Sequence, residues 1–96
     1  MSREDVLTLL RSHRDEIERF GVSSLRLFGS VARGEAAAES DVDLLVGFRD
    51  VPTFSGYMKL QIFLEDLLGA KVDLVTESGL RDRVRSYVEK DAIRVA

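Results

Sequence analysis

The sequence predicts an α/β domain in which helices pack on a small mixed β-sheet. Two stretches, residues 3–20 and 53–68, repeat apolar side chains at the three- and four-residue spacing of a helix with one buried face. Three shorter apolar runs, residues 24–28, 41–47 and 71–75, have the composition and length of strands. Because helices and strands alternate along the chain, we expect the helices to cover the sheet.

Size and composition narrow the possible classes of protein. The 96 residues suffice for one domain, residues 1–96, and leave no room for a second. A net charge of −3 argues against a generic nucleic-acid binder, and the absence of cysteine excludes disulfides, thiolate metal sites and cysteine nucleophiles. No run of about 18 apolar residues and no apolar leader is present, so we expect no membrane span and a cytoplasmic location.

The first helix has recognisable start and stop signals. Ser2 and Asp5 have the spacing of a capping box, and Gly21 is a natural stop. His13, the one histidine, lies on the apolar face of this helix. A histidine in such a position is more often a half-buried packing residue than a catalytic one, and we interpret it so.

The later elements follow the same logic. Pro52 precedes the second long helix and Gly69 ends it. Residues 80–90 predict a last helix, and residues 92–95 a short strand. So short a sheet must expose edges, which a partner protein could cover. We interpret the basic residues of the last helix as an exposed face, with contact to a partner or to phosphate as the alternative: Arg81, Arg83 and Arg85.

The turn after the first strand predicts a phosphate-binding site. Gly29 and Ser30 follow the apolar run Leu25–Phe28 and open a short helical turn at residues 31–33. Unpaired N–H groups and the helix dipole favour an anion at such a position. We therefore expect Ser30 and the N–H groups of the turn to hold terminal phosphates. Arg33 either neutralises charge on the pyrophosphate or the aspartates, or serves only as a structural counter-ion.

Three aspartates predict a metal site beside this turn. Asp41 and Asp43 are two residues apart on the second strand, so their side chains point to the same side with Cα atoms about 6.5 to 7 Å apart. Two such carboxylates repel each other unless a cation lies between them. Asp73 lies between apolar neighbours in the third strand and reaches the open side of the pair if the two strands are adjacent. Charges in central strands are costly unless paired or metal-bound.

These groups together predict nucleotide chemistry. Carboxylates are hard oxygen ligands suited to Mg²⁺, and two ions about 3.5 to 4 Å apart stabilise both the attacking and the leaving oxygen of an in-line displacement. Asp41 and Asp43 would hold the metals against a triphosphate, and Asp73 would lie near the acceptor hydroxyl as a metal ligand and candidate base. Gly-Ser or Asp-x-Asp alone is common, but their combination with a third carboxylate is far more specific.

The pattern Gly-Ser, ten residues, Asp-x-Asp resembles the nucleotidyltransferase superfamily that includes DNA polymerase beta. It is carried here by Gly29, Ser30, Asp41 and Asp43. The fuller strings, Gly-Ser-Val-Ala-Arg-Gly and Ser-Asp-Val-Asp-Leu, look like the minimal nucleotidyltransferases (MNT) of bacteria and archaea. Asp73 falls where that family carries its third carboxylate. The resemblance extends from the first strand through the third and implies the polymerase beta-like fold.

The resemblance also implies an activity. Members transfer a nucleoside monophosphate from a triphosphate to a hydroxyl and release pyrophosphate, so we expect Mg²⁺-dependent transfer, with ATP as the donor of AMP. Minimal members are frequently encoded beside a HEPN-domain protein. In those pairs the MNT protein is the antitoxin of a HEPN ribonuclease, and some members adenylylate a tyrosine of the toxin. The resemblance thus implies a protein adenylyltransferase that acts as the antitoxin of a type VII-like toxin–antitoxin system.

Two other functions stay open on the sequence alone. The chain could be a binding module that neutralises a toxin by covering it, with a vestigial or regulatory nucleotide site. It could also modify a small molecule, with two chains building the acceptor pocket. Because 96 residues leave little surface for such a pocket, we expect the acceptor on another polypeptide and a homo- or hetero-oligomer. No residue selects the base of the nucleotide.

Overall fold

The computed structural model describes residues 2–35, 41–79, 88, 90 and 92–96. Its sheet has four strands in the order β3-β2-β1-β4: β1 (Val22–Phe28), β2 (Val42–Phe48), β3 (Val72–Thr76) and β4 (Ile93–Arg94). The helices are α1 (Arg3–Ser12), α2 (Arg14–Glu18), α3 (Gly29–Ala32) and α4 (Phe54–Leu68), and the 3-10 helix η1 (Glu77–Gly79) follows β3.

The sheet is mixed, as predicted. Strand β1 runs antiparallel to both β2 and β4, whereas β2 and β3 are parallel. Parallel neighbours need a crossover connection, and α4 supplies it between β2 and β3. The parallel register pairs Asp43 with Asp73. The two strands that carry the predicted carboxylates are therefore adjacent.

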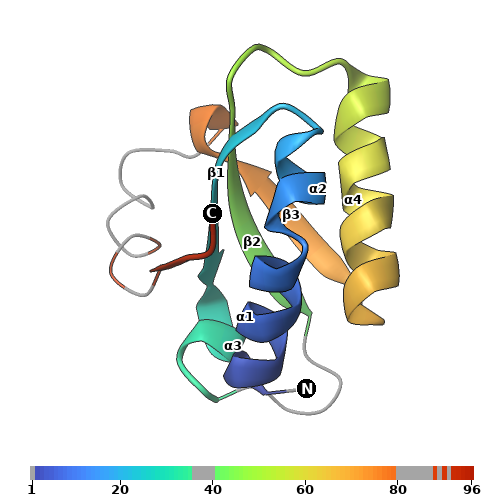
Figure 1. The fold of residues 1–96 in the computed structure, drawn as a ribbon. Coiled ribbons are helices and arrows are strands. Elements are labelled where there is room, and N and C mark those ends of the chain that lie inside the picture. Colours follow the sequence, from blue (N-terminus) through green and yellow to red (C-terminus); the bar gives the residue numbers. More distant parts are fainter. Residues whose placement is uncertain (1, 36–40, 80–87, 89, 91) are drawn as a thin grey trace.

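One hydrophobic core fills the space between the sheet and α1, α2 and α4, which lie on the same face of the sheet (Figure 1). The alternating residues of β2 on the side opposite Asp43 are all buried: Val42, Leu44 and Val46. They pack with fully buried leucines of the helices, Leu10, Leu60 and Leu64. Burying each such leucine stabilises the fold by roughly 1.5–3 kcal/mol. The pleat that buries these residues directs Asp43 to the opposite face.

The first helix differs from the prediction of one continuous helix over residues 3–20. It ends at Ser12, and α2 begins at Arg14. His13 interrupts it with φ −112° and ψ 20°, and its ring Nδ1 lies 2.9 Å from the carbonyl oxygen of Leu9. The break has a physical cause, because a side chain that bonds a backbone carbonyl competes with the helical ladder. His13 is half-buried, in agreement with its interpretation as a packing residue.

The helix ends otherwise agree with the sequence. The Ser2 hydroxyl accepts the N–H of Asp5 at 3.1 Å, and the Asp5 carboxylate accepts the N–H of Ser2 at 3.1 Å. These two bonds are the reciprocal pair of a capping box, and the backbone bond to Ser2 lowers the pKa of Asp5. The Thr53 hydroxyl caps α4 by accepting the N–H of Gly56, and Gly69 ends that helix with φ +62°.

The short strand predicted over residues 92–95 is confirmed as β4. The helix predicted over residues 80–90, with its basic residues Arg81, Arg83 and Arg85, lies outside the described residues except for Val88 and Lys90. None of the helices in the described part of the chain has the length and apolar character that crossing a membrane requires.

Candidate active site

The Gly29 turn and the Asp43 carboxylate lie in contact. Strand β1 ends at Phe28, which is paired with Asp43 of β2. The chain then turns at Gly29 with φ +77°, a conformation that favours glycine. A Cβ atom on Gly29 would lie 2.1 Å from Oδ2 of Asp43, so the carboxylate occupies the space that any other residue would fill. The structure thus brings together two residues of the predicted site that are fourteen positions apart.

The helix after the turn is too short for its dipole to attract an anion strongly. Helix α3 has four residues, so it contributes little of the macrodipole of a long helix. The first N–H groups of a helical turn nevertheless lack partners within it. The interaction with an anion predicted for Ser30 therefore depends on these N–H groups and on the hydroxyl. Ser30 is half-buried, whereas Val31 and Ala32 are buried and anchor the turn to the core.

Two arginines stabilise this region in different ways. Arg3 of α1 donates from Nη1 to the carbonyl of Ala32 at 3.2 Å and so ties the end of α3 to the first helix. The sequence carries no signal of this contact, because an exposed arginine in a first helical turn is common and has no fixed partner. Arg33 forms an exposed ion pair with Glu35 at 3.1 Å, and its charge also favours the ionised form of Asp43. Arg33 is therefore close enough to act as a counter-ion of the aspartates.

The three predicted carboxylates gather at one end of the sheet. Asp43 and Asp73 are register partners on adjacent parallel strands, which lie about 4.8 Å apart in any sheet. Asp41 directly precedes β2, two residues before Asp43. Asp41 and Asp73 are exposed, and Asp43 is half-buried. The condition set by the sequence, that the second and third strands be neighbours, is met.

The electrostatics of Asp43 favour a bound cation. Burial raises the pKa of Asp43, and the negative charges of Asp73 and Asp41 raise it further, while Arg33 acts in the opposite direction. An ionised carboxylate is unfavourable under these conditions unless a positive charge approaches it. This arrangement is typical of carboxylates that bind a metal ion or act on substrate.

The three aspartates have the chemistry of Mg²⁺ ligands, but their side chains must reorient to share one ion. Carboxylate oxygens are the ligands that Mg²⁺ accepts in proteins. Over the described ranges, no three acidic or histidine side chains stand close enough together to hold an ion as they are. Asp41 and Asp73 are exposed, and exposed side chains change rotamer readily. The site is therefore compatible with Mg²⁺ if these two side chains rotate.

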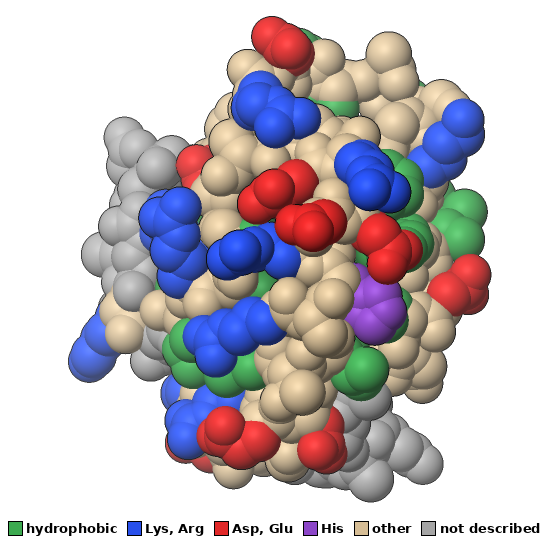
Figure 2. All heavy atoms as spheres, viewed as in Figure 1, with side chains coloured by type: hydrophobic (Ala, Val, Ile, Leu, Met, Phe, Trp, Pro, Cys, Tyr) green, Lys and Arg blue, Asp and Glu red, His purple; other side chains and the backbone are tan. Residues whose placement is uncertain are grey.

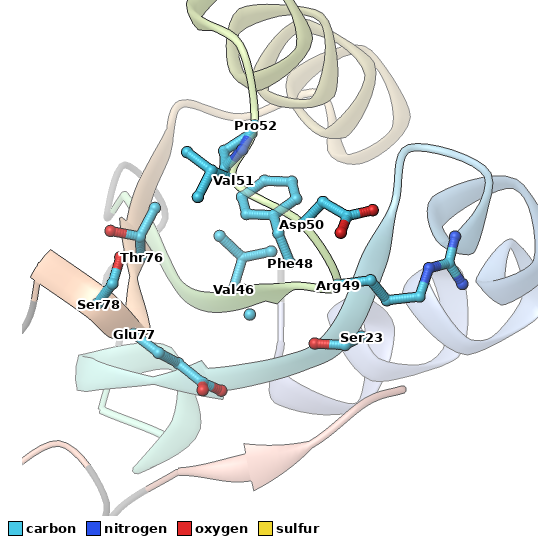
Figure 3. A pocket seen from close by; sticks show the side chains of 11 residues that line it. Ser23, Val46, Phe48, Arg49, Asp50, Val51, Pro52, Thr76, Glu77 and Ser78 are labelled. Carbon is cyan, nitrogen blue, oxygen red and sulfur yellow. The ribbon is translucent and has the colours of Figure 1, made fainter.

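A hollow of about 330 Å³ lies elsewhere, where β2 and β3 end (Figure 3). Two of its charged side chains, Glu77 and Arg49, are already engaged. Glu77 accepts the hydroxyl of Ser24 at 2.7 Å and lies 3.6 Å from the guanidinium of Arg26, and Arg49 donates to the carbonyl of Glu18. None of the three aspartates lines this hollow. The face seen in Figure 2 carries basic and acidic side chains side by side. Because none of the predicted carboxylates lines the hollow, we place the candidate site at Asp41, Asp43 and Asp73 and not there.

Comparison with known proteins agrees with this geometry. Residues 10–95 match the family model described as "Nucleotidyltransferase domain". The chain is similar to the protein adenylyltransferase MntA of Thermococcus cleftensis, with 40% identity over 96 residues that cover 99% of this chain and 97% of the relative.

Solved structures show the same fold. One described as a minimal nucleotidyltransferase superposes with a TM-score of 0.85 at 42% identity, covering 97% of this chain and 95% of the other. A second contains a tri-AMPylated HEPN toxin of Shewanella oneidensis in complex with an MNT antitoxin. It matches with a TM-score of 0.68 at 18% identity, covering 94% of this chain and 71% of the other, which shows a shared fold alone. By the match to the family model and the identity to MntA, this chain belongs to the nucleotidyltransferase domain family.

Proposed function

We propose that this nucleotidyltransferase moves AMP from ATP to a hydroxyl of a HEPN toxin and acts as its antitoxin. The observation that carries the proposal is the contact between the Gly29 turn and Asp43, with Asp73 beside it in register. This contact supports a phosphate group and a carboxylate-bound cation at adjacent positions. Near-complete coverage of a relative named as a protein adenylyltransferase supports a protein as the acceptor.

Each residue has a role that follows from its position. Ser30 and the N–H groups of the turn would hold the terminal phosphates, with Arg33 neutralising charge nearby. Asp41 and Asp43 would hold Mg²⁺ against the triphosphate, and two ions are the arrangement that the three carboxylates suit. When bound, Mg²⁺ stabilises negative charge on the attacking and leaving oxygens. Asp73 would complete the metal site on the acceptor side.

The transfer step is a single displacement at phosphorus. The acceptor hydroxyl oxygen forms a bond to the α-phosphorus of ATP while the bond from that phosphorus to the pyrophosphate oxygen breaks. The hydroxyl proton passes to the carboxylate of Asp73, and pyrophosphate leaves with the electron pair of the broken bond. The product is an AMP ester of the acceptor. Transfer requires the three carboxylates to be ionised and the acceptor to enter beside β3.

The test is transfer of label from α-labelled ATP to a co-expressed HEPN partner in the presence of Mg²⁺. Wild-type protein should label the partner, and the double variant Asp41→Asn/Asp43→Asn should not. The matched control removes the same charge at two exposed positions away from the site, Asp50→Asn/Asp66→Asn, and should label the partner as wild type does.

Two results would replace this proposal with another function. If the Asp41→Asn/Asp43→Asn variant still neutralised the toxin as well as wild type, the chain would act by binding and not by catalysis. If label appeared in small products without any partner protein, the acceptor would be a small molecule, with a second copy of the chain completing its pocket. In both cases the control variant should behave as wild type.

A further inference from the structure

Three polar side chains of α4 bond the backbone of β3. The hydroxyl of Tyr57 donates to the carbonyl of Leu74. Gln61 donates from Nε2 to the carbonyl of Val72 at 3.2 Å, and Glu65 accepts the N–H of Val72 at 3.0 Å. The three residues follow each other at intervals of four, so they lie on one face of the helix. We call Tyr57, Gln61 and Glu65 the α4 clamp.

The clamp bonds the side of β3 that faces away from β2. Among the strands of the described residues, in the order β3-β2-β1-β4, strand β3 has a neighbour on one side only. The N–H of Val42 in β2 donates to the carbonyl of Lys71 at 2.9 Å, which fixes the direction of the backbone groups. Because these groups alternate along a strand, those of Asp73 face β2, and those of Val72 and Leu74 face outward.

Outward groups of an edge strand usually bond water or a foreign strand. Here three of these groups, the N–H and the carbonyl of Val72 and the carbonyl of Leu74, bond side chains of α4, the helix that connects β2 to β3. The helix thereby fixes the edge strand relative to the core on which α4 packs. The sequence predicts exposed sheet edges. At β3 the edge is partly covered, because side chains of α4 bond three of its backbone groups.

Asp73 lies between the two clamped residues. Its own backbone faces β2, while Val72 and Leu74 on either side of it are bonded to α4. A shift of β3 along β2 would therefore break the clamp, and a weakened clamp would allow Asp73 to move relative to Asp43. Misplacement of a reacting group by about 1 Å can cost about 10²-fold in rate.

We propose that Tyr57, Gln61 and Glu65 are positioning residues that hold Asp73 in register with Asp43 for nucleotidyl transfer. The inference rests on the proposed function for the role of Asp73. The α4 clamp acts through the backbone of β3 and not by touching nucleotide or acceptor. The Tyr57 hydroxyl must stay protonated to donate its hydrogen bond to Leu74. Burial raises the pKa of Tyr57 above its usual range, and the charge of Asp73 raises it further, so the phenol stays a donor well above neutral pH.

The first test needs neither metal nor nucleotide. Amide hydrogen exchange of Val72 and Asp73 is measured by NMR in the full chain and in Glu65→Leu, which removes the acceptor and keeps good helix propensity. Exchange of both amides should rise at least tenfold, because the Val72 N–H loses its partner and the pairing of β3 loosens. Glu65→Gln keeps an acceptor oxygen and should restore slow exchange. Asp66→Leu makes the same kind of change one residue away on the exposed face and should leave exchange unchanged.

The second test is kinetic and separates positioning from stability. Well below the melting temperature, Tyr57→Phe and Gln61→Leu should lower kcat for transfer about 10- to 100-fold. They should change KM for ATP less than twofold, because Gly29, Ser30, Asp41 and Asp43 lie outside β3. Tyr57→Phe keeps the packed ring and removes only the hydroxyl. Lys59→Leu on the exposed face is the control for Gln61→Leu.

The outcomes separate the inference from the proposed function. Unchanged exchange at Val72 and Asp73 in Glu65→Leu would overturn the α4 clamp. If exchange is faster in Glu65→Leu but Tyr57→Phe and Gln61→Leu keep the kcat of the control, the bonds are purely structural. That result would overturn the positioning role. If wild-type protein transfers no nucleotide, the proposed function fails, and the exchange at Asp73 still decides whether the clamp fixes that residue.

Discussion

Replacing Gly29 by alanine tests the contact on which the site depends. Gly29 has φ +77°, where an L-residue costs roughly 1–2 kcal/mol. The new Cβ would also lie 2.1 Å from Oδ2 of Asp43, so the carboxylate must move about 1 Å or more to restore an ordinary contact. Gly21→Ala is the matched control, because Gly21 has φ +86° and no atom within 4 Å of its Cβ position.

Both variants should be destabilised, and they should differ in activity. The positive φ should cost each roughly 1–2 kcal/mol of unfolding free energy, which lowers Tm by about 4–8 °C per kcal/mol in a domain of this size, and the contact with Asp43 adds to the loss in Gly29→Ala. Movement of Asp43 by about 1 Å should lower transfer about 10²-fold in Gly29→Ala, and transfer should stay near wild type in Gly21→Ala. Thermal melts by circular dichroism and labelled-ATP transfer measure the two quantities. Equal activity of the two variants would refute the idea that the carboxylate must lie against Gly29.

Three further predictions follow from the electrostatics and the contacts of the site. Because the pKa of Asp43 is raised in the folded protein, stability is lost as pH rises from the unfolded pKa of about 3.9 through the folded pKa. Asp43→Asn should therefore be more stable than wild type at pH 7 without metal, an advantage that is absent at pH 3 and is measurable by urea melts. Mg²⁺ with ATP at about 100 times the Kd should stabilise wild type by about 2.7 kcal/mol in thermal melts, and chelation or Asp41→Asn/Asp43→Asn should abolish this gain. Arg3→Gln removes the bond to the Ala32 carbonyl and should weaken ATP binding about threefold to tenfold by calorimetry, whereas unchanged affinity would show that the α3 turn is held without it.

The elements of the fold were largely predictable because their signals are local. Apolar spacing predicted the helices and strands, and glycines at positive φ marked ends such as Gly69. The break at His13 could not be predicted in this way, since it depends on the ring bonding the Leu9 carbonyl. Alternation along β2 places Leu45 on the face that carries Asp43, away from Leu44 and Val46, yet Leu45 is buried too.

The site residues were predictable as types, and their mutual contacts were not. The spacing of Ser30, Asp41 and Asp43 identified candidates, whose roles remain proposals. The contact between Gly29 and Asp43 needs the register of β1 against β2, which no local pattern supplies. Tyr57 lies in the stretch that was predicted as a helix with an apolar face, and its hydroxyl bond to β3 is visible only once the strand is placed.

The α4 clamp did leave a signal that could have been found. Gln61 and Glu65 follow Tyr57 at intervals of four in a helix whose neighbouring positions are apolar. Polar groups along the border of an apolar face often bond a neighbouring backbone, because buried backbone groups must find partners. Which backbone they bond depends on the packing of α4 against β3.

The intact mass of a HEPN partner co-expressed with this chain tests the proposed transfer of AMP most directly. With wild-type protein the partner should gain the mass of one or more AMP groups. It should gain none with Asp41→Asn/Asp43→Asn, and it should gain the wild-type mass with Asp50→Asn/Asp66→Asn. A partner that is neutralised by wild-type protein yet keeps its unmodified mass would contradict the assignment of this site to nucleotidyl transfer.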